Sequence, residues 1–388
     1  MEMMKRAMAL VLALCLLLPC AVLAEDDEEV SLLEIVEEVE LADEETDTAD
    51  EAAAETDGDE EAEVMISDEA MESIEIMDAE IDESVDPDSL DLNTNLPDNV
   101  VNILLVGVDT RSTDMDEGYQ HGDVQIICSI NKDTGSVKLT SLQRDLHVAI
   151  PGYTSKNRIN VAYARGGGEL AMRTINSVFE MNIEYYVTIN FYGLASIIDA
   201  IGGVDIEMTK AEAKAINTYL KKHPPKYDNQ GDDYERVPLE VRSGVQHLDG
   251  IQAVMYARTR SVDNDFGRTA RQRKLLDLLL QKIMKDNMSI DKLVELMQVC
   301  MPYVTTNLNA STMLQLGVGL LGSDLISRAK AGESLLEQHR IPMDETWKYD
   351  HTDSGASVVV FRTVKRRQEN VEALHKFIYG EYIPAKTE

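Results

Sequence analysis

The sequence predicts an α/β domain with a mixed β-sheet, because short apolar runs alternate with segments whose apolar residues recur at helical spacing. The first run, Val100–Val106, is nearly continuous in apolar residues, as expected for a strand buried on both faces of a parallel sheet. The next two runs, Val124–Ile130 and Val137–Leu142, flank the turn sequence Asn131–Gly135 and indicate an antiparallel hairpin. A parallel-type strand beside a hairpin predicts a mixed sheet.

The remaining elements continue this alternation. Further strands are expected at Tyr185–Phe191, Val204–Met208 and Val358–Phe361. Helices are expected at Leu170–Phe179, Leu194–Ile201, Arg271–Met284, Ile290–Leu321 and Val371–Phe377. Residues 221–240 contain three prolines and many charges, and are expected to form a surface loop. No second domain boundary is indicated after residue 100.

The first 24 residues have the features of an export signal. Lys5 and Arg6 precede the uncharged, mostly apolar stretch Ala7–Ala24, which ends in small residues typical of a cleavage site. The stretch is slightly shorter than the roughly 20 residues that span a bilayer, so a signal peptide is favoured and a retained membrane anchor is the alternative. We therefore expect residues 1–24 to direct the chain outside the cytoplasm, where it is either membrane-anchored or released.

Residues 25–98 differ from the rest of the chain in charge. They contain 33 Asp and Glu and no Lys or Arg, whereas Asn99 onward carries 34 Lys and Arg against 37 Asp and Glu. Dense like charge with few aromatic residues predicts an acidic disordered linker before a domain at 99–388. The nearly neutral domain on an exported chain argues against nucleic-acid binding. Cys128 and Cys300 lack zinc-like spacing and are expected to be buried hydrophobes.

The segment from Tyr256 to Arg273 is unusually rich in arginine. It holds five arginines and no lysine within the sixteen residues from Arg258 to Arg273. The planar guanidinium group binds phosphate oxygens through two parallel hydrogen bonds and keeps its charge. The segment therefore indicates an anion site, with a charged helix start held by local salt bridges as the alternative of equal weight.

Other charged residues lie near predicted strand ends. Asp109 follows the first strand, Asp123 precedes the second, and Arg144 follows the third. Open α/β sheets bind ligands at the carboxyl ends of their strands, so these side chains are expected to meet at one edge. Two carboxylates that face a phosphate are a common way to hold Mg²⁺. Taken alone, each aspartate is more typical of a turn or helix cap.

Seven segments, in order and spacing, resemble the LytR-CpsA-Psr family. They are GVDTR (107–111), QRD followed by PG (143–152), NRINVAYARGG (157–167), YYVTINFYGL (185–194), IDAIGGVDIEM (198–208), LDGIQAVMYARTR (248–260) and DFGRTARQRKLL (265–276). The resemblance covers roughly residues 99–380. It implies a three-layer α/β/α sandwich around the mixed sheet and a long hydrophobic pocket for a polyprenyl chain.

The resemblance also implies an activity. Members of this family are phosphotransferases that move a glycopolymer, such as wall teichoic acid or capsule polysaccharide, from undecaprenyl pyrophosphate to a peptidoglycan hydroxyl. The partners implied are this lipid-linked polymer, peptidoglycan and the outer surface of the cytoplasmic membrane. The cofactor implied is Mg²⁺, with Mn²⁺ as a substitute.

Matching the motifs residue by residue assigns roles within this sequence. Metal binding is expected of Asp109 and Asp123. Catalytic roles are expected of Arg144, Arg258, Arg260, Asp265 and Arg268. Substrate binding is expected of Arg111, Arg158, Arg271 and Gln272. The general base is expected to be Asp123 or Asp265.

Two other functions remain open at this point. If water replaces the wall hydroxyl, the same site is a polyprenyl pyrophosphate phosphohydrolase. If no turnover occurs, the chain is a lipid-binding or regulatory protein of the envelope. The set of arginines and aspartates favours catalysis, because lipid binding alone requires no metal ligands.

Overall fold

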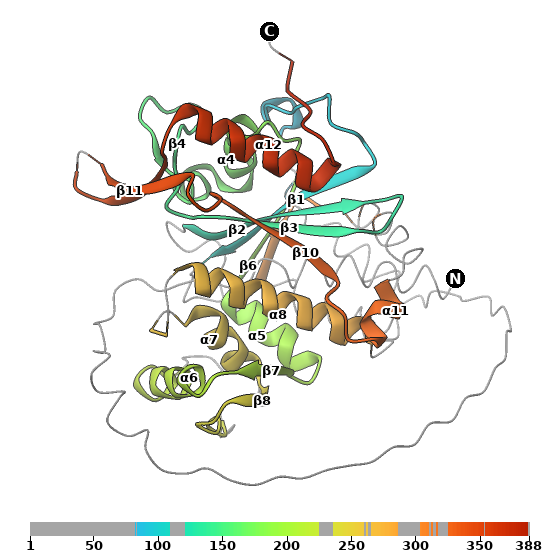
Figure 1. The fold of residues 1–388 in the computed structure, drawn as a ribbon, viewed down its shortest axis with the longest axis vertical. Helices are drawn as coiled ribbons and strands as arrows, with labels where there is room; N and C mark the ends of the chain where they lie inside the picture. Colours follow the sequence, from blue (N-terminus) through green and yellow to red (C-terminus); the bar gives the residue numbers. More distant parts are fainter. Residues whose placement is uncertain are drawn as a thin grey trace, which may run out of the picture.

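A computed structural model of the chain describes residues 82, 84–108, 121–224, 236–259, 261–262, 265–285, 303–309, 312, 316, 325–352 and 354–386. The predicted export signal and most of the acidic segment lie outside these residues. Figure 1 shows a central sheet with helices above and below it. In the described part of the chain, no helix is both long and apolar enough to span a membrane.

The central sheet has six strands in the order β10-β3-β2-β1-β6-β9. The strands are β1 (Val100–Val108), β2 (Gly122–Asn131), β3 (Val137–Leu142), β6 (Tyr185–Asn190), β9 (Val304–Thr306) and β10 (Leu336–Ile341). β1 runs parallel to β6 and antiparallel to β2, β2 and β3 form the predicted antiparallel hairpin, and β10 runs parallel to β3. The sheet is therefore mixed, which confirms the predicted fold class.

Two helical layers cover the sheet (Figure 1). Helices α4 (Val161–Phe179) and α12 (Val364–Tyr379) lie on one face, and α5 (Phe191–Ala200), α7 (Gly250–Arg258) and α8 (Asp265–Lys285) lie on the other. The smaller helical elements are α6 (Lys210–Lys222), α11 (Leu325–Lys330) and the 3₁₀ turn Pro87–Ser89. Six short strands form three antiparallel pairs: β4–β5 (His147–Val148, Asn157–Arg158), β7–β8 (Val204–Met208, Gly244–Leu248) and β11–β12 (Trp347–His351, Ser357–Phe361).

Side chains alternate along each strand and so divide the core in two. In β1, Leu104 and Val106 join the cluster beneath α4 and α12, while Ile103 and Leu105 join the cluster beneath α5, α7 and α8. Strand side chains point to opposite faces in turn, so an apolar run without alternation must be covered on both sides. This pattern is the physical reason why Val100–Val106 was predicted as a fully buried strand.

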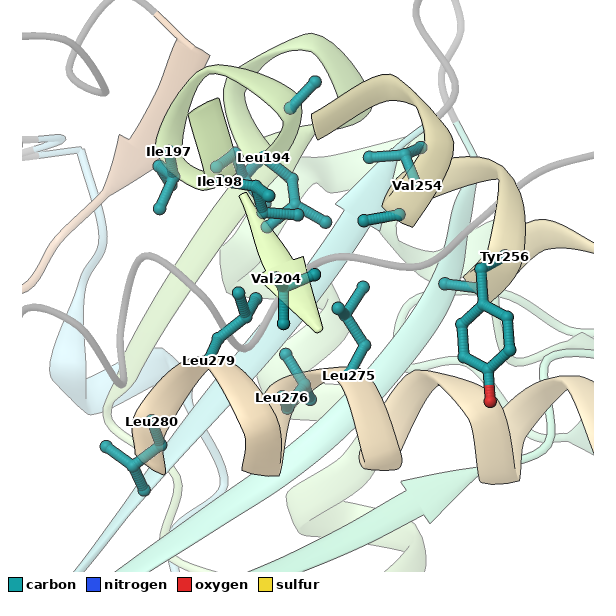
Figure 2. Packing of buried hydrophobic residues seen from close by; sticks show 14 of the residues in the cluster. Leu194, Ile197, Ile198, Val204, Val254, Tyr256, Leu275, Leu276, Leu279 and Leu280 are labelled. Atoms are coloured by element: carbon teal, nitrogen blue, oxygen red, sulfur yellow. The ribbon is translucent and has the colours of Figure 1, made fainter. Parts of the chain in front are cut away.

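Figure 2 shows the core of the second helical layer. Leu275, Leu276 and Leu279 of α8 point toward Val204 of β7 and toward the helices α5 and α7. These leucines recur at spacings of three and four residues, which places them on one face of α8. Their burial fixes which face of α8, and therefore which of its arginines, points into the protein.

Helix α4 is interrupted by glycines near its start. Gly167 has φ +60° and ψ −153°, outside the helical region, and Gly166 is also non-helical. A Cβ on Gly168 would lie 2.5 Å from the ring of Tyr186, so the helix can approach β6 only with glycine there. The helix expected from the sequence begins only at Leu170, because this break separates the first turn of α4 from the rest.

The structure confirms most predicted elements and corrects two. The predicted helix Ile290–Leu321 is wrong in part, because Val304–Thr306 forms the edge strand β9 against β6. The predicted loop 221–240 is wrong at its start, because Lys221 and Lys222 end helix α6, which a Thr209–Glu212 capping box begins. The three residues of β9 are too few to show an alternating pattern in the sequence. The many charged residues of α6 obscured its helical pattern.

The end of the acidic segment is folded. Leu90 and Leu96 are buried, and Asn93 Nδ2 donates to the carbonyl oxygens of Glu180 (2.9 Å) and Ile383 (3.1 Å). Residues 84–98 thus join the loop after α4 to the C-terminal segment. The folded unit therefore begins before Asn99, the boundary expected from the change in charge.

Candidate functional site

The end of β1 and the start of β2 lie side by side at one edge of the sheet. Val108 pairs with Gly122 in the antiparallel ladder, so the chain leaves β1 next to Asp123. Asp109 itself lies outside the described residues, as do Arg111 and Arg260. The predicted meeting of Asp109 and Asp123 therefore rests on the strand register alone.

Asp123 is a buried carboxylate with two donors on one oxygen. Arg144 Nη1 lies 3.2 Å from Asp123 Oδ1, and Asn160 Nδ2 donates to the same oxygen over 2.8 Å. The Asp123 side chain is 7% exposed, which shields both contacts from water. A buried ion pair that is reinforced by a further hydrogen bond holds its members in a fixed geometry.

Two further ion pairs, both to Asp145, continue from the first. Asp145 Oδ2 lies 3.7 Å from Arg144 Nε, and Asp145 Oδ1 lies 3.3 Å from Arg158 Nε. Arg158 Nη2 also donates to the carbonyl oxygen of Ser357 at the start of β12 over 2.7 Å. Charges thus alternate from Asp123 to Arg158. We call Asp123, Arg144, Asp145, Arg158 and Asn160 the sheet-edge cluster.

Backbone hydrogen bonds fix the position of the sheet-edge cluster. The Asn160 N–H donates to the Arg144 carbonyl (3.3 Å), and the Gly122 N–H donates to the Asn160 carbonyl (3.2 Å). Asn160 therefore joins the start of β2 to the loop after β3 and immediately precedes α4. Because its side chain also contacts Asp123, the position of that carboxylate depends on Asn160.

The other predicted site arginines within the described residues lie on α7 and α8, in the helical layer on the other face of the sheet from α4 and α12. Arg258 ends α7, and its guanidinium stacks 6.0 Å from the ring centre of Tyr219 on α6. Arg268 and Gln272 lie one turn apart on α8, and each is 1% exposed. Both point into the protein, as the leucine face of α8 requires. Asp265 begins α8, and its side chain lies outside the described residues.

Arg271 has structural partners. Its Nη1 lies 3.4 Å from Glu212 Oε1 on α6, and its Nη2 donates to the carbonyl oxygen of Thr259 directly after α7. Both side chains of the ion pair are nearly buried. These contacts join α6, α7 and α8, so Arg271 stabilises the layer whatever its role toward a substrate.

Arg273 connects α8 to the sheet. Its Nη1 donates to Ser141 Oγ (3.0 Å) in β3, and its Nε donates to Gln338 Oε1 (2.8 Å) in β10. Ser141 stands three residues before Arg144. Helix α8 is therefore bonded near the carboxyl end of β3, and Arg144 of the sheet-edge cluster follows that same end.

The sheet-edge cluster has oxygen ligands that fit Mg²⁺. Both contacts that Asp123 makes with other described residues use its Oδ1. The amide oxygens of Gln125 and Asn160 are buried and accept no hydrogen bond from the described residues. Mg²⁺ binds oxygen ligands and takes only one or two carboxylates. Within the described residues, no group of three His, Cys, Asp or Glu side chains forms a metal site.

The structure therefore brings together three predicted residues, Asp123, Arg144 and Arg158. It places Arg258, Arg268, Arg271 and Gln272 on α7 and α8, and their roles toward a substrate stay predictions. Sequence reasoning missed Asp145 and Asn160 as members of the site. Asp145 directly follows Arg144 in the motif QRD, and Asn160 stands two residues after Arg158 in the motif NRIN. Their place in these motifs was the signal that could have identified them.

A cavity of about 1170 Å³ lies elsewhere, at the far end of the second helical layer. Its lining includes Asp199, His247, Asp249 and Tyr303, around the end of α5, the β7–β8 hairpin and the start of α7. Much of this lining is polar, and its acids cap α7 through Gly250 N–H and Gln252 N–H. It does not match the long apolar pocket that the family resemblance implies, which stays a prediction.

Comparison with known proteins identifies similar sequences. The model of the LytR_cpsA_psr family matches residues 64–358. The chain is 29% identical over 246 residues to the polyisoprenyl-teichoic acid–peptidoglycan teichoic acid transferase TagV of Bacillus subtilis, covering 61% of this chain and 58% of that protein. It is 31% identical over 218 residues to TagU of Enterococcus faecalis, covering 56% and 64%. It is 29% identical over 219 residues to the biofilm regulatory protein A of Streptococcus mutans, covering 54% and 50%.

The matched part of the chain thus spans between 50% and 64% of the length of these relatives. Solved structures resemble the fold more completely. The crystal structure of B. subtilis TagV matches with a TM-score of 0.53 and 23% identity, over 74% of this chain and all of that chain. The structure described as TagT bound to LIIa-WTA matches with a TM-score of 0.53 and 21% identity, over 72% and 91%. At this identity the likeness shows the fold.

Proposed function

Because this chain belongs to the LytR-CpsA-Psr family, we propose that it transfers a glycopolymer from a polyprenyl-pyrophosphate carrier to a hydroxyl of peptidoglycan. The product is a phosphodiester that links polymer and wall. The observation that carries this proposal is the sheet-edge cluster, in which the buried carboxylate of Asp123 at the start of β2 and the partly exposed guanidinium of Arg144 after β3 are held together beside the carboxyl ends of β1 and β3. The relatives TagV and TagU are named as teichoic acid transferases, which supports this reaction class.

The charges of the site suit phosphoryl transfer. Attack of a hydroxyl on phosphorus increases negative charge on the equatorial and leaving oxygens. Arg144 and Arg158 lie at the strand ends, where their guanidinium groups can bind those oxygens. Asp145 lies between the two arginines and sets their separation. Fixed cations stabilise the transition state because they need no reorganisation during the reaction.

Asp123 has two tasks in this proposal. Its Oδ1 orients Arg144, and the same carboxylate, together with Asp109 and the amide oxygens of Gln125 or Asn160, would hold Mg²⁺. When bound, Mg²⁺ supplies positive charge that polarises a phosphoryl oxygen. The proton of the incoming hydroxyl passes to a carboxylate, for which Asp123 and Asp265 are the candidates.

The location follows from the proposed substrates. Peptidoglycan and its polyprenyl-linked precursors meet at the outer surface of the cytoplasmic membrane. We propose that residues 1–24 bring the chain there as a signal peptide or an anchor. The cargo is an anionic or neutral glycopolymer, such as wall teichoic acid or capsule.

A regulatory function is the second candidate, because two similar curated proteins are named as regulatory: biofilm regulatory protein A and MsrR of Staphylococcus aureus. A hydrolase is the third, because water can replace the hydroxyl at the same site. The three differ in their products. Transfer yields polymer bound to peptidoglycan, hydrolysis yields free phosphorylated polymer, and regulation yields neither.

The test is a reconstituted reaction. The purified full-length chain, Mg²⁺ and a polyprenyl-pyrophosphate-linked glycopolymer are incubated with and without peptidoglycan. We expect polyprenyl phosphate release that depends on peptidoglycan, with polymer recovered on the wall fraction. Release at the same rate without peptidoglycan would show a hydrolase. Lipid binding without release would favour regulation.

A further inference from the structure

The hairpin of β11 and β12 is attached to the sheet-edge cluster. The Val359 N–H donates to the Asp145 carbonyl over 2.9 Å, and Val359 also forms a β-bridge with Leu146. The Arg158 guanidinium donates to the Ser357 carbonyl through Nε (3.1 Å) and Nη2 (2.7 Å). Figure 1 shows the hairpin projecting from the side of the molecule where β4 lies. Its position is therefore fixed relative to Asp145 and Arg158.

The outer strand of this hairpin carries an exposed tyrosine. β11 pairs with β12 and with no other strand in the described part of the chain. Tyr349, in the middle of β11, is 63% exposed. It stands opposite Val359 in the antiparallel ladder, so two strand spacings, about 10 Å, separate it from Asp145. A ligand that reacts at the sheet-edge cluster can therefore reach Tyr349 with its next unit.

The Tyr349 ring has a fixed neighbour and keeps an open face. Trp347, two residues earlier on the same side of β11, lies with its ring centre 5.0 Å from that of Tyr349 and its plane at 87°. Trp347 is half-buried and packs against the core cluster beneath α4 and α12. An edge-to-face contact uses at most one of the two faces of a ring. Tyr349 is therefore held by Trp347 and still presents an aromatic face to solvent.

A third ring continues the same side of the strand toward the sheet-edge cluster. His351 follows Tyr349 by two residues, about 7 Å along the strand, and is exposed. It stands opposite Ser357, whose carbonyl accepts from the Arg158 guanidinium. An exposed row thus leads from Tyr349 past His351 to the arginine that the proposed reaction uses.

The chemistry of this row suits a sugar. The C–H groups of a sugar ring carry partial positive charge and stack on the negative face of an aromatic ring. Its hydroxyl and amide groups need hydrogen-bonding partners, which His351 and the Ser357 hydroxyl offer. A membrane or a protein interface would favour several apolar side chains together. The neighbours of Tyr349 in the strand are instead Lys348 and Asp350, which form an ion pair over 3.0 Å.

We propose that Tyr349, with Trp347 behind it and His351 beside it, forms a platform that binds a sugar ring of the acceptor glycan. This inference rests on the proposed function and adds to it the surface where the acceptor binds. The sugar with the reacting hydroxyl lies at Arg158, and a neighbouring sugar of the same strand stacks on Tyr349.

The test is co-sedimentation of the full-length chain with insoluble, polymer-free peptidoglycan, with no lipid-linked donor present. We expect Tyr349→Ser to weaken binding about tenfold, because the stacking contact is lost. Tyr349→Phe keeps the ring and is expected to bind as the unchanged chain does. The matched control is Val245→Ser, at an exposed strand residue of the β7–β8 hairpin in the other helical layer. This control is also expected to bind normally.

Equal binding by the unchanged chain and Tyr349→Ser would overturn the platform. Normal binding by Tyr349→Leu would also overturn it, because leucine is apolar but has no aromatic face. A soluble tetramer of N-acetylglucosamine is expected to compete with peptidoglycan. Competition by the stem peptide and not by the tetramer would assign the surface to a peptide and overturn the sugar platform.

These binding measurements need no donor, so they are independent of turnover. Transfer to peptidoglycan by a chain whose binding does not depend on Tyr349 removes the platform alone. Binding that depends on Tyr349 in a chain that transfers no polymer removes the proposed function alone.

Discussion

The sheet-edge cluster and the arginine face of α8 carry the same residue type but balance its charge differently. In the sheet-edge cluster, Arg144 and Arg158 alternate with Asp123 and Asp145, so every charge has a neighbour of opposite sign. On α8, Arg271 is paired with a carboxylate, whereas the contacts of Arg273 within the described residues are with the neutral oxygens of Ser141 and Gln338. The first region alternates opposite charges, and the second contains one arginine in an ion pair and one bonded to neutral groups.

The two α8 arginines show why a run of charges in a sequence is ambiguous. Arg271 and Arg273 are two residues apart and therefore point to different sides of the helix. One meets Glu212 of α6, and the other meets Ser141 of β3. The ion pair of Arg271 fits the interpretation of this segment as a salt-bridged helix start, and the interpretation as an anion site stays a prediction.

The largest expected effect is on turnover through the sheet-edge cluster. Asp123→Asn keeps the size of the side chain but removes the charge that orients Arg144. We expect the rate of polyprenyl phosphate release to fall about 10²–10³-fold, as when a preorganised electrostatic contact is lost. Single-turnover kinetics measure this rate. Asp205→Asn, at an exposed pair with His247, is the matched control and should react normally.

The next largest expected effect is on the free energy of unfolding, and it differs between variants of Arg271 and Arg273. Arg271→Leu leaves Glu212 buried without its partner and should lower the free energy of unfolding by about 3 kcal/mol. Arg273→Gln removes an unbalanced cation and should change it by less than about 0.5 kcal/mol. Urea denaturation of both variants measures the difference. If the two variants lose equal stability, the ion pair with buried Glu212 does not distinguish Arg271 from Arg273.

Asn160 tests how the sheet-edge cluster is held together. Asn160→Ala removes the 2.8 Å hydrogen bond to Asp123, at an expected cost of about 1–2 kcal/mol in stability. If Asn160 positions Asp123 for a metal, the Mg²⁺ concentration for half-maximal rate should also rise several-fold. A stability loss with unchanged Mg²⁺ dependence would show a merely structural role.

The smallest expected effect is on the pH dependence of stability, and it comes from a buried, neutral histidine. His375 of α12 is fully buried, its Nδ1 accepts from the Ile383 N–H, and its Nε2 lies 3.0 Å from the Phe179 carbonyl. Burial lowers the pKa of His375, although Glu180 acts in the opposite sense. The unfolded chain, with a His pKa of about 6.5, therefore binds the proton more readily.

Stability should consequently be complete above about pH 6.5 and decrease as the pH falls below it. Denaturation midpoints of the unchanged chain and His375→Gln, measured between pH 8 and pH 5.5, test this. We expect a smaller pH dependence in the variant, with part of the slope retained because burial also lowers the pKa of His339. Identical slopes would show that His375 does not titrate differently on unfolding.

The sequence predicted the fold well where packing imposes a period. The buried run Val100–Val106, the hairpin and the amphipathic α8 all follow from which faces are covered, and each is present. The sequence could not predict β9, because three residues show no period, or the break in α4, because it depends on the approach of Tyr186 to Gly168.

The candidate site was predictable in part. Residue type and motif order led to Asp123, Arg144 and Arg158, which the structure brings together. The contributions of Asn160 and Asp145 depend on contacts between segments more than ten residues apart, which spacing does not encode. The ion-pair partner of Arg271 could not be predicted for the same reason, since Glu212 stands on α6, which was not among the expected helices.

The central claim is that the sheet-edge cluster is the centre of phosphoryl transfer. The most direct measurement is single-turnover release of polyprenyl phosphate by Arg144→Gln, with Arg173→Gln, an exposed arginine paired with Asp91, as the control. We predict that Arg144→Gln lowers the rate by at least about 10²-fold while it remains folded, and that the control reacts as the unchanged chain does. A folded Arg144→Gln chain that releases the lipid at the rate of the control would contradict the claim.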